Sequence, residues 1–142
     1  MTRSQAREQA FTLLFEKSFH PETEMEDIIE LGLANELVED DPFTLRLVNT
    51  AWDRLFEIDA RIERHAKNWK IKRMSKVALS VLRLAVCELL YIEDVPPAAA
   101  INEAVELCKK YASAEDASFV NGILGAVARE REGQAAESAQ NE

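Results

Sequence analysis

Glycine and proline are scarce in this sequence of 142 residues, which contains only four of each. Both residues interrupt helices and strands, so their scarcity favours long elements with few breaks. Alternating runs of β-branched residues, the pattern of half-buried strands, are also missing. Hydrophobic residues make up 47% and charged residues 30%, which is the balance of a folded domain and not of a disordered chain. These features predict an all-α protein.

Cysteine and histidine are too few for the sites that they usually build. Cys87 and Cys108 are the two cysteines, and each lies in an apolar helical pattern, so we expect reduced core residues and no disulfide framework. His20 and His65 lie in unrelated segments without a cysteine or an acid at ligand spacing, which predicts no metal site. No glycine-rich phosphate loop is present either. We therefore expect neither a cofactor nor an enzyme.

Long hydrophobic runs are missing as well. The most apolar stretch, residues 77–92, is shorter than the ~20 residues of a membrane span and includes Arg83 and Glu88. Charged side chains are scattered through residues 2–19, which argues against a signal peptide. The sequence therefore predicts a cytoplasmic protein without a membrane partner.

Bases are absent from residues 22–41, which hold nine acids and are called the acidic segment below. This segment accounts for the whole net charge of −9, since the remainder of the chain is neutral. Residues 61–76 show the opposite bias, with seven bases and the single acid Glu63. The chain is therefore electrically polarised, so a basic surface can exist on a protein that is acidic as a whole.

Apolar residues at helical spacing predict six or seven helices. In the first half of the chain we expect helices at residues 4–18, at residues 24–38 and from Pro42 onward, the last with a break near Ile58 and Asp59. Asp41 followed by Pro42 is a typical helix start. Gly32 lies on the apolar face of the second helix, where it either permits close approach of another helix or simply weakens the turn.

In the second half, residues 77–92 are apolar nearly all round, which is typical of a helix in the middle of a bundle. Two prolines follow, and the next helix is expected to run to about residue 111. Ser113, three residues before Asp116, approximates a capping box that opens a last helix. Residues 133–142 are small and polar, and we expect a disordered tail there.

The start of the first helix contains Arg3, Gln5 and Arg7. Cations at a helix N-terminus oppose the helix dipole, at about 0.3–1 kcal/mol each when exposed. An anionic ligand would relieve this mismatch, which makes the segment a candidate for binding nucleic acid. The alternative is a frayed, charged helix start.

A second group of cations follows helical spacing further along the chain. Its members share one helix face and are Arg73, Lys76, Ser80 and Arg83. Three cations on one stripe of a helix are a candidate surface for following a phosphate backbone. The alternative is a solvated edge, with Arg83 paired inside the bundle to an acid such as Glu88 or Glu103.

Residues 94–125 contain DVP, then INEAVEL, then FVNGIL. This order resembles the C-terminal half of the NusB transcription antitermination family. ARE at residues 6–8 and LRLAVCEL at residues 82–89 fit the family in the same order, and the resemblance spans roughly residues 3–127. INEA alone is weak evidence, but the motifs are specific in combination.

The resemblance implies two fused small helical bundles within one domain at residues 1–132, an N-terminal bundle at about 1–68 and a C-terminal bundle at about 69–132. Members of the family bind the small-subunit ribosomal protein NusE, and the pair binds the boxA element of nascent ribosomal RNA transcripts. This complex helps RNA polymerase to read through terminators. The resemblance therefore implies a non-enzymatic, RNA-binding antitermination factor, which is either a monomer or a homodimer.

The resemblance also implies roles for individual residues. Arg3 and Arg7 correspond to an arginine-rich start that contacts RNA, while Gln5 stands where an arginine is common. Phe119, which by its position alone is either a core residue or a base-stacking aromatic, corresponds to an aromatic at the RNA-facing helix start. Phe15 falls where the family contacts NusE. Together with Lys76 from the second group of cations, the expected RNA-binding residues are Arg3, Gln5, Arg7, Lys76 and Phe119.

Two departures from the family pattern leave alternatives open. Ser4 and Gln5 replace arginines, and Ser118 stands where a lysine is usual, so we expect weak RNA binding alone and tighter binding with NusE. A protein-binding or homodimeric helical adaptor with little RNA affinity is the alternative. An RNA-binding domain of a ribosomal RNA methyltransferase would need a catalytic domain that is not seen. Three roles stay open for the acidic segment: it repels wrongly docked RNA, it binds a basic protein, or it is simply solvated surface.

Overall fold

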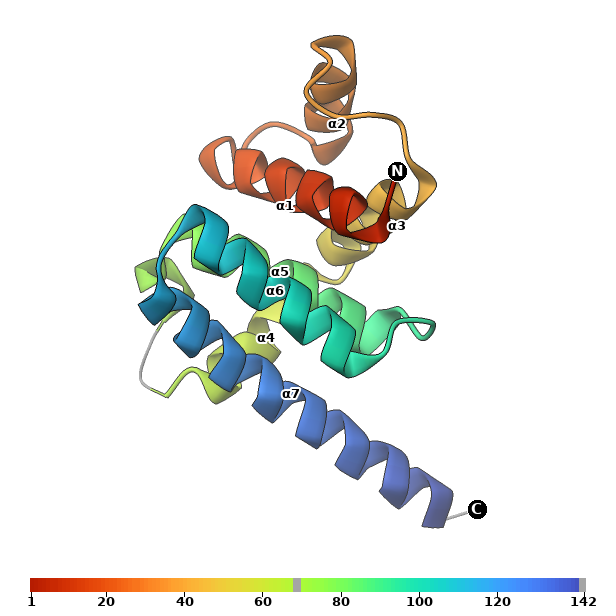
Figure 1. Ribbon diagram of the computed structural model, residues 1–142, viewed down its shortest axis with the longest axis vertical. Helices are drawn as coiled ribbons and strands as arrows, with labels where there is room; N and C mark the ends of the chain where they lie inside the picture. Colours follow the sequence, from red (N-terminus) through yellow and green to blue (C-terminus); the bar gives the residue numbers. More distant parts are fainter. Residues whose placement is uncertain (68–69, 141–142) are drawn as a thin grey trace.

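A computed structural model of the protein shows seven α-helices and one short 3₁₀-helix in its described part (Figure 1). The structure describes residues 1–67 and 70–140, and the side chains of all of these except 135–140. No strand occurs in these ranges, which confirms the predicted all-α class. The elements are α1 (Arg3–Phe19), α2 (Met25–Ala34), α3 (Pro42–Asp53), α4 (Leu55–His65), η1 (Ile71–Arg73), α5 (Lys76–Tyr91), α6 (Pro97–Tyr111) and α7 (Ala114–Gln140).

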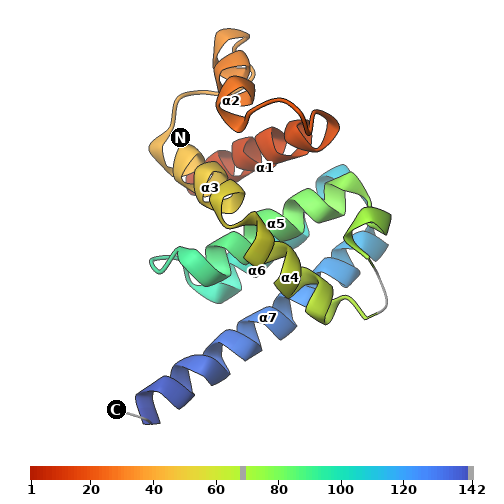
Figure 2. The same cartoon turned by 180° about the vertical axis from the view of Figure 1, so that it is seen from behind.

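The helix α5 lies at the centre of the molecule, as its apolar sequence predicts (Figure 2). Helices α1, α3, α4, α6 and α7 all pack against it. The hydroxyl of Ser75 caps its N-terminus by accepting a hydrogen bond from the backbone N–H of Ala78 at 3.0 Å. Leu82, Leu84 and Leu89 are almost completely buried along its length. These five helices therefore enclose α5 within one hydrophobic core.

The break between α3 and α4 lies at Arg54, and the prediction of a break near Ile58 and Asp59 is wrong. Ile58 and Ile62 are fully buried and belong to one continuous helix. The break redirects the chain, because α3 packs against α1 and α5 whereas α4 packs against α5 and α7. No glycine or proline marks Arg54, so the hydrophobic pattern alone could not locate the change of direction.

The helix α7 continues past Gly133 to Gln140, where the sequence predicted a disordered tail over residues 133–142. Alanine, glutamine and glutamate dominate this stretch and are strong helix formers, which explains why the helix continues beyond the core. Figures 1 and 2 show this end of α7 projecting away from the other helices. Residues 141–142 lie outside the described residues.

The division into two bundles near residue 68 stays a prediction. One hydrophobic core includes Leu13 of α1, Ile62 of α4 and Leu124 of α7, and so runs through both expected bundles. The helix α4, which the prediction assigns to the N-terminal bundle, packs on α5 and α7. Among the residues described, no helix combines the length and the apolar composition that crossing a bilayer requires.

Both cysteines are free and buried, which confirms their prediction as reduced core residues. Burial raises the pKa of the Cys87 thiol to about 12, with a smaller contribution from the charge of Glu88. Burial likewise raises the pKa of the Cys108 thiol to about 11. Both side chains therefore stay protonated at neutral pH and serve as packing residues.

Candidate nucleic-acid interface

The start of α1 is capped by its own side chains. The hydroxyl of Thr2 accepts a hydrogen bond from the backbone N–H of Gln5 at 3.0 Å, and the Gln5 side chain accepts one from the backbone N–H of Thr2 at 2.8 Å. This reciprocal capping box satisfies two donors that a helix start leaves unpaired. Gln5 is exposed, but its carbonyl oxygen is already engaged in holding the helix start. The signal was present in the sequence as Thr-x-x-Gln.

Arg3 lies at the surface beside the connection between α5 and α6. Its Nη2 is 3.2 Å from Oδ2 of Asp94, and its guanidinium lies 4.0 Å from the ring centroid of Phe43. The hydrogen bond from Arg3 lowers the pKa of Asp94, assisted by the charge of Arg46. Both partners of the Arg3–Asp94 pair are about half exposed, at 52% each, so the pair is weak and an RNA phosphate can compete for the arginine.

Arg7 is buried, with 5% of its surface exposed, and does not face solvent as an RNA ligand would. Its Nε donates a hydrogen bond to Oε1 of Glu88 at 2.8 Å, and Nη1 lies 3.8 Å from Glu103. This geometry does not fit the predicted direct RNA contact and instead makes Arg7 a residue that holds α1 to α5. The sequence contained a signal for this pairing, because Glu88 is an acid inside the apolar stretch of α5 and a buried carboxylate requires a buried partner.

Lys76 is exposed at the first position of α5 and reaches the C-terminal end of α1. Its Nζ donates to the carbonyl of Ser18 at 3.2 Å and lies 5.1 Å from the ring centroid of Phe19. A cation at this position is favoured by the negative end of the α1 dipole. Lys76 therefore binds the C-terminal end of α1 and, because it is exposed, also remains accessible to a ligand.

The predicted cationic stripe along α5 does not form. Ser80 is buried and its hydroxyl donates to the carbonyl of Lys76 at 2.7 Å. Arg83 makes two hydrogen bonds to Asp59 of α4, at 2.9 Å and 2.8 Å, which confirms the alternative of an arginine paired to an acid, with Asp59 as the partner in place of Glu88 or Glu103. Of the stripe, Arg73 and Lys76 remain exposed.

Phe119 is half-buried in the first turns of α7, where it packs against the core and lines two hollows in the surface. The predicted cap is present, because the hydroxyl of Ser113 accepts a hydrogen bond from the backbone N–H of Asp116 at 3.1 Å. The first hollow measures about 360 Å³ and is also lined by Arg73 and Ser75. Phe119 thus contributes to the core and also borders open surface.

The second hollow beside Phe119 is a basic cleft of about 500 Å³ between α4 and α7. Arg64, Lys67 and Arg129 line this cleft. Glu130 pairs with Arg64 at 2.7 Å, but within the described ranges no acid pairs with Lys67 or Arg129. The charge bias of residues 61–76 pointed to this region, whereas Arg129 stands too far along the sequence for the pattern to include it.

The candidate RNA residues fall into two separate groups at opposite ends of α1, the helix whose course Figure 1 shows. Arg3 lies beside Asp94 at the start of the helix, whereas Lys76 lies beside Ser18 at its end. Seventeen residues of α-helix span roughly 25 Å. The structure thus brings Phe119 near the Lys76 end and leaves Arg3 and Gln5 at the other.

A row of aromatic side chains runs along α1. The ring centroid of Phe15 lies 5.8 Å from that of Phe11 and 5.0 Å from that of Phe19. Tyr111 of α6 extends the row, with its ring centroid 5.1 Å from that of Phe11. Phe19 is 52% and Tyr111 42% exposed, so the row offers an apolar surface to a protein partner.

Residues 4–129 match the model of the NusB family. The chain belongs to the NusB family. It is 42% identical over 131 residues to the transcription antitermination protein NusB of Lachnoclostridium phytofermentans, an alignment that covers 89% of this chain and 98% of the relative. It is 40% identical over 127 residues to the corresponding protein of Agathobacter rectalis, with 87% and 97% covered.

A solved structure gives the same family and adds a partner context. A chain in the crystal structure of antitermination factors NusB and NusE in complex with dsRNA superimposes with a TM-score of 0.81 at 30% identity. The match covers 90% of this chain and 96% of that chain. The predicted family and the NusB-like fold are therefore confirmed, whereas the roles assigned to single residues stay predictions.

Proposed function

We propose that this NusB-family protein is a non-enzymatic antitermination factor that, together with NusE, binds the boxA element of nascent ribosomal RNA transcripts. The observation that carries the proposal is the likeness, over 90% of the chain, to a structure in which NusB and NusE bind dsRNA. The relatives named transcription antitermination protein support the same role. The protein acts in the cytoplasm as part of the RNA polymerase antitermination complex.

The RNA is proposed to contact both groups of cations. Arg3 contributes at the start of α1, and Lys76 with Phe119 and the basic cleft contributes at the other end. Since Arg7 is buried and the chain carries a net charge of −9, the electrostatic part of the affinity is small. NusE supplies the remaining contacts, so the protein binds RNA weakly alone and more tightly in the complex.

NusE is proposed to dock on the aromatic row of α1. Phe15 packs between Phe11 and Phe19, and Phe19 exposes half of its surface. Burying a phenylalanine side chain contributes about 1.5–3 kcal/mol. Lys76, which lies over Phe19, is placed to contact the RNA and the bound protein together.

A protein-binding adaptor with little RNA affinity is the second candidate, and the buried position of Arg7 favours it. Arg7 is unavailable to a phosphate, and the Gln5 side chain is engaged in the helix cap. Arg3 is then the sole cation left in the segment that the family fills with arginines. The group of RNA contacts at the start of α1 would then be reduced to Arg3, whereas the group at the Phe119 end would be unchanged.

A mobility-shift assay of boxA RNA, with and without NusE and across a salt series, tests the proposal. We expect a weak shift with the protein alone at low salt and a stronger, specific shift when NusE is added. An RNA of scrambled sequence serves as the control. The absence of a shift at low salt in the presence of NusE would leave the adaptor as the function.

A further inference from the structure

A hollow of about 310 Å³ lies between α1 and α2, on a surface that the proposed function does not use. Its apolar lining consists of Leu13, Ile28, Leu31, Leu37 and Val38. Leu31 is 58% and Leu37 73% exposed, which is unusual for two neighbouring leucines. The surface therefore offers an apolar pocket with two exposed leucines at its edge.

The turn after α2 holds Leu37 in its outward position. Glu36 adopts a left-handed backbone conformation with φ 56°, which glycine normally occupies at a helix end. The backbone N–H of Leu37 donates to the carbonyl of Gly32 at 2.9 Å, and that of Glu36 donates to Leu33 at 3.2 Å, which are the hydrogen bonds of a Schellman motif. In that motif Leu37 would normally pack against the side chain at the position of Gly32.

Gly32 has no side chain to receive Leu37. Val38 occupies the space instead, since its Cγ2 lies 3.1 Å from where a Cβ of residue 32 would stand. Of the two predicted roles of Gly32, the structure thus supports close approach. Because Val38 fills the space beside Gly32, the side chain of Leu37 has no contact there and stays exposed.

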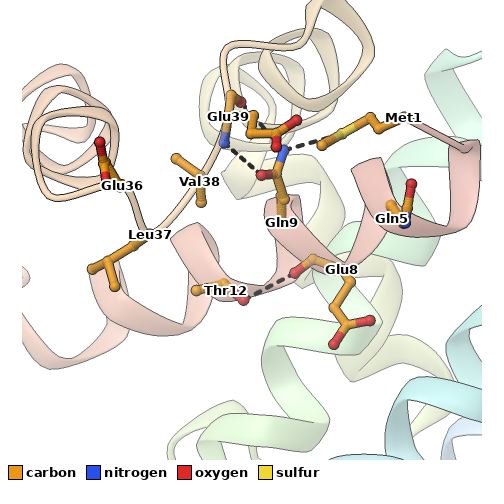
Figure 3. A pocket seen from close by; sticks show the side chains of 9 residues that line it. All are labelled: Met1, Gln5, Glu8, Gln9, Thr12, Glu36, Leu37, Val38 and Glu39. Atoms are coloured by element: carbon orange, nitrogen blue, oxygen red, sulfur yellow. Dashed lines mark hydrogen bonds between the residues drawn. The ribbon is translucent and has the colours of Figure 1, made fainter.

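The position of this turn is fixed to α1 by Gln9 (Figure 3). The Gln9 side chain accepts a hydrogen bond from the backbone N–H of Glu39 at 2.6 Å and donates one to the carbonyl of Glu39 at 3.3 Å. Glu36, Leu37 and Glu39 also line a neighbouring polar hollow of about 510 Å³. The exposed leucine therefore lies on a braced turn between an apolar and a polar hollow.

The rim of the apolar hollow is negatively charged. Glu16 lines the hollow from α1, and the exposed acids Glu30 and Glu36 stand next in sequence to its lining residues Leu31 and Leu37, so these three acids form the rim. Among the described residues, no lysine or arginine forms an ion pair with an acid of the acidic segment. Lys17 is buried and donates to the carbonyls of His20 and Pro21, and His20 pairs with Glu16 at 3.2 Å. The negative charge is therefore left for a partner.

We propose that the hollow between α1 and α2 docks a basic amphipathic segment of a protein partner. Apolar side chains of that segment fill the hollow around Leu31 and Leu37, and its lysines or arginines pair with the acidic rim. RNA is repelled by the rim, and two copies of this chain would bring like charges together. The inference is independent of the proposed function, because the hollow contains none of the candidate RNA residues.

Binding of a synthetic probe tests the chemistry of the site. The probe is an amphipathic helical peptide of leucine and lysine, and its control carries glutamate in place of lysine. We expect the lysine peptide to perturb the amide NMR signals of residues 12–38 of the full chain, with an affinity that falls as salt rises. Binding of both peptides with equal affinity, or shifts spread over other acidic surfaces, would overturn the proposal.

A pair of matched variants separates docking from general charge attraction. L31S with L37S should weaken the lysine peptide about tenfold or more, because both leucines lose their apolar contacts. Phe56→Ser, at an 86% exposed apolar residue of α4, should leave the affinity unchanged. Equal effects of the two variants would contradict the proposal, as would boxA RNA perturbing the same residues.

A photo-crosslinker placed at Leu37 of the full chain in cells identifies the natural occupant. The proposal requires an adduct to a segment with more lysines and arginines than acids. An adduct to a second copy of this chain, an adduct to an acidic segment, or no adduct would each overturn it.

Discussion

Arg7 and Glu88 form a buried ion pair between α1 and α5. Each side chain gives the other a partner of opposite charge, so neither charge is buried alone. Burial raises the pKa of Glu88, against the lowering effect of the hydrogen bond from Arg7. The pair is thus costly to bury but more costly to break, because a single uncompensated charge would remain inside the protein. Its role is to fix how α1 lies on the central helix.

Arg7→Ala should therefore lower the free energy of unfolding by about 3–5 kcal/mol, because it leaves Glu88 buried without a partner. Arg3→Ala, which removes a half-exposed arginine, should cost less than about 1 kcal/mol and serves as the control. Urea denaturation followed by circular dichroism measures both. Equal losses in the free energy of unfolding for the two variants would contradict the buried ion pair of Arg7.

Glu8 gives the molecule a contact whose strength depends on pH. Hydrogen bonds from Lys110 and Tyr111 hold the pKa of Glu8 below its ordinary value of 4.5. A carboxylate with a lowered pKa stabilises the fold above its ordinary pKa, and this contribution is lost as the pH falls through the lowered value. Glu8→Gln should thus destabilise the protein at neutral pH, while the difference from wild type should disappear in acid. Urea denaturation at the two pH values measures this, and a difference independent of pH would contradict it.

At the scale of elements, helix starts were the most predictable features and changes of direction the least. Asp41 caps α3 and Ser113 caps α7 as predicted, because a cap is a local property of a few residues. The break at Arg54 depends on which neighbours α3 and α4 pack against, and this information lies elsewhere in the chain. The same holds for Asp59, whose bond to Arg83 joins two helices that the sequence could not place side by side.

The turn after α2 contains a residue that is strained for its position. Glu36→Gly should raise the free energy of unfolding by about 1 kcal/mol, because glycine adopts a left-handed conformation without the cost that a side chain incurs. Glu39→Gly in the same turn relieves no such strain and should not stabilise the protein. Thermal melting of the two variants decides between them, and a lower melting temperature for Glu36→Gly would contradict the account.

At the scale of the whole molecule, acids and bases are separated in space as well as in sequence. The acidic segment forms α2 and the turn beside the hollow, whereas Lys67 and Arg129 border the cleft between α4 and α7. Besides Arg3, the RNA is therefore expected to contact the α4–α7 side, and the basic protein segment is expected at the hollow between α1 and α2.

Replacing Lys67 and Arg129 together by alanine should reduce the salt dependence of RNA binding in the presence of NusE. Each phosphate contact with single-stranded RNA contributes about 0.7 to the slope of log affinity against log salt, so the slope should fall by about 1.4. Arg54→Ala, an exposed cation at the far end of α4, should leave the slope unchanged. An unchanged slope in the double variant would remove the cleft from the RNA site.

The family and the helical class were predictable from the sequence because the motifs are short and local. The role of Arg7 was not, since whether a side chain is exposed depends on a partner 81 residues away. The basic cleft was predictable in part, because residues 61–76 show the charge bias while Arg129 joins them only in the folded chain.

Antitermination itself is tested most directly by transcription in vitro through a terminator placed after a boxA-containing leader. With RNA polymerase, NusE and the other factors of the complex present, addition of this protein should increase the fraction of transcripts that pass the terminator. The same addition should have no effect on a template whose boxA is scrambled. Readthrough that does not change when the protein is omitted, or that rises equally on the scrambled template, would contradict the proposed function.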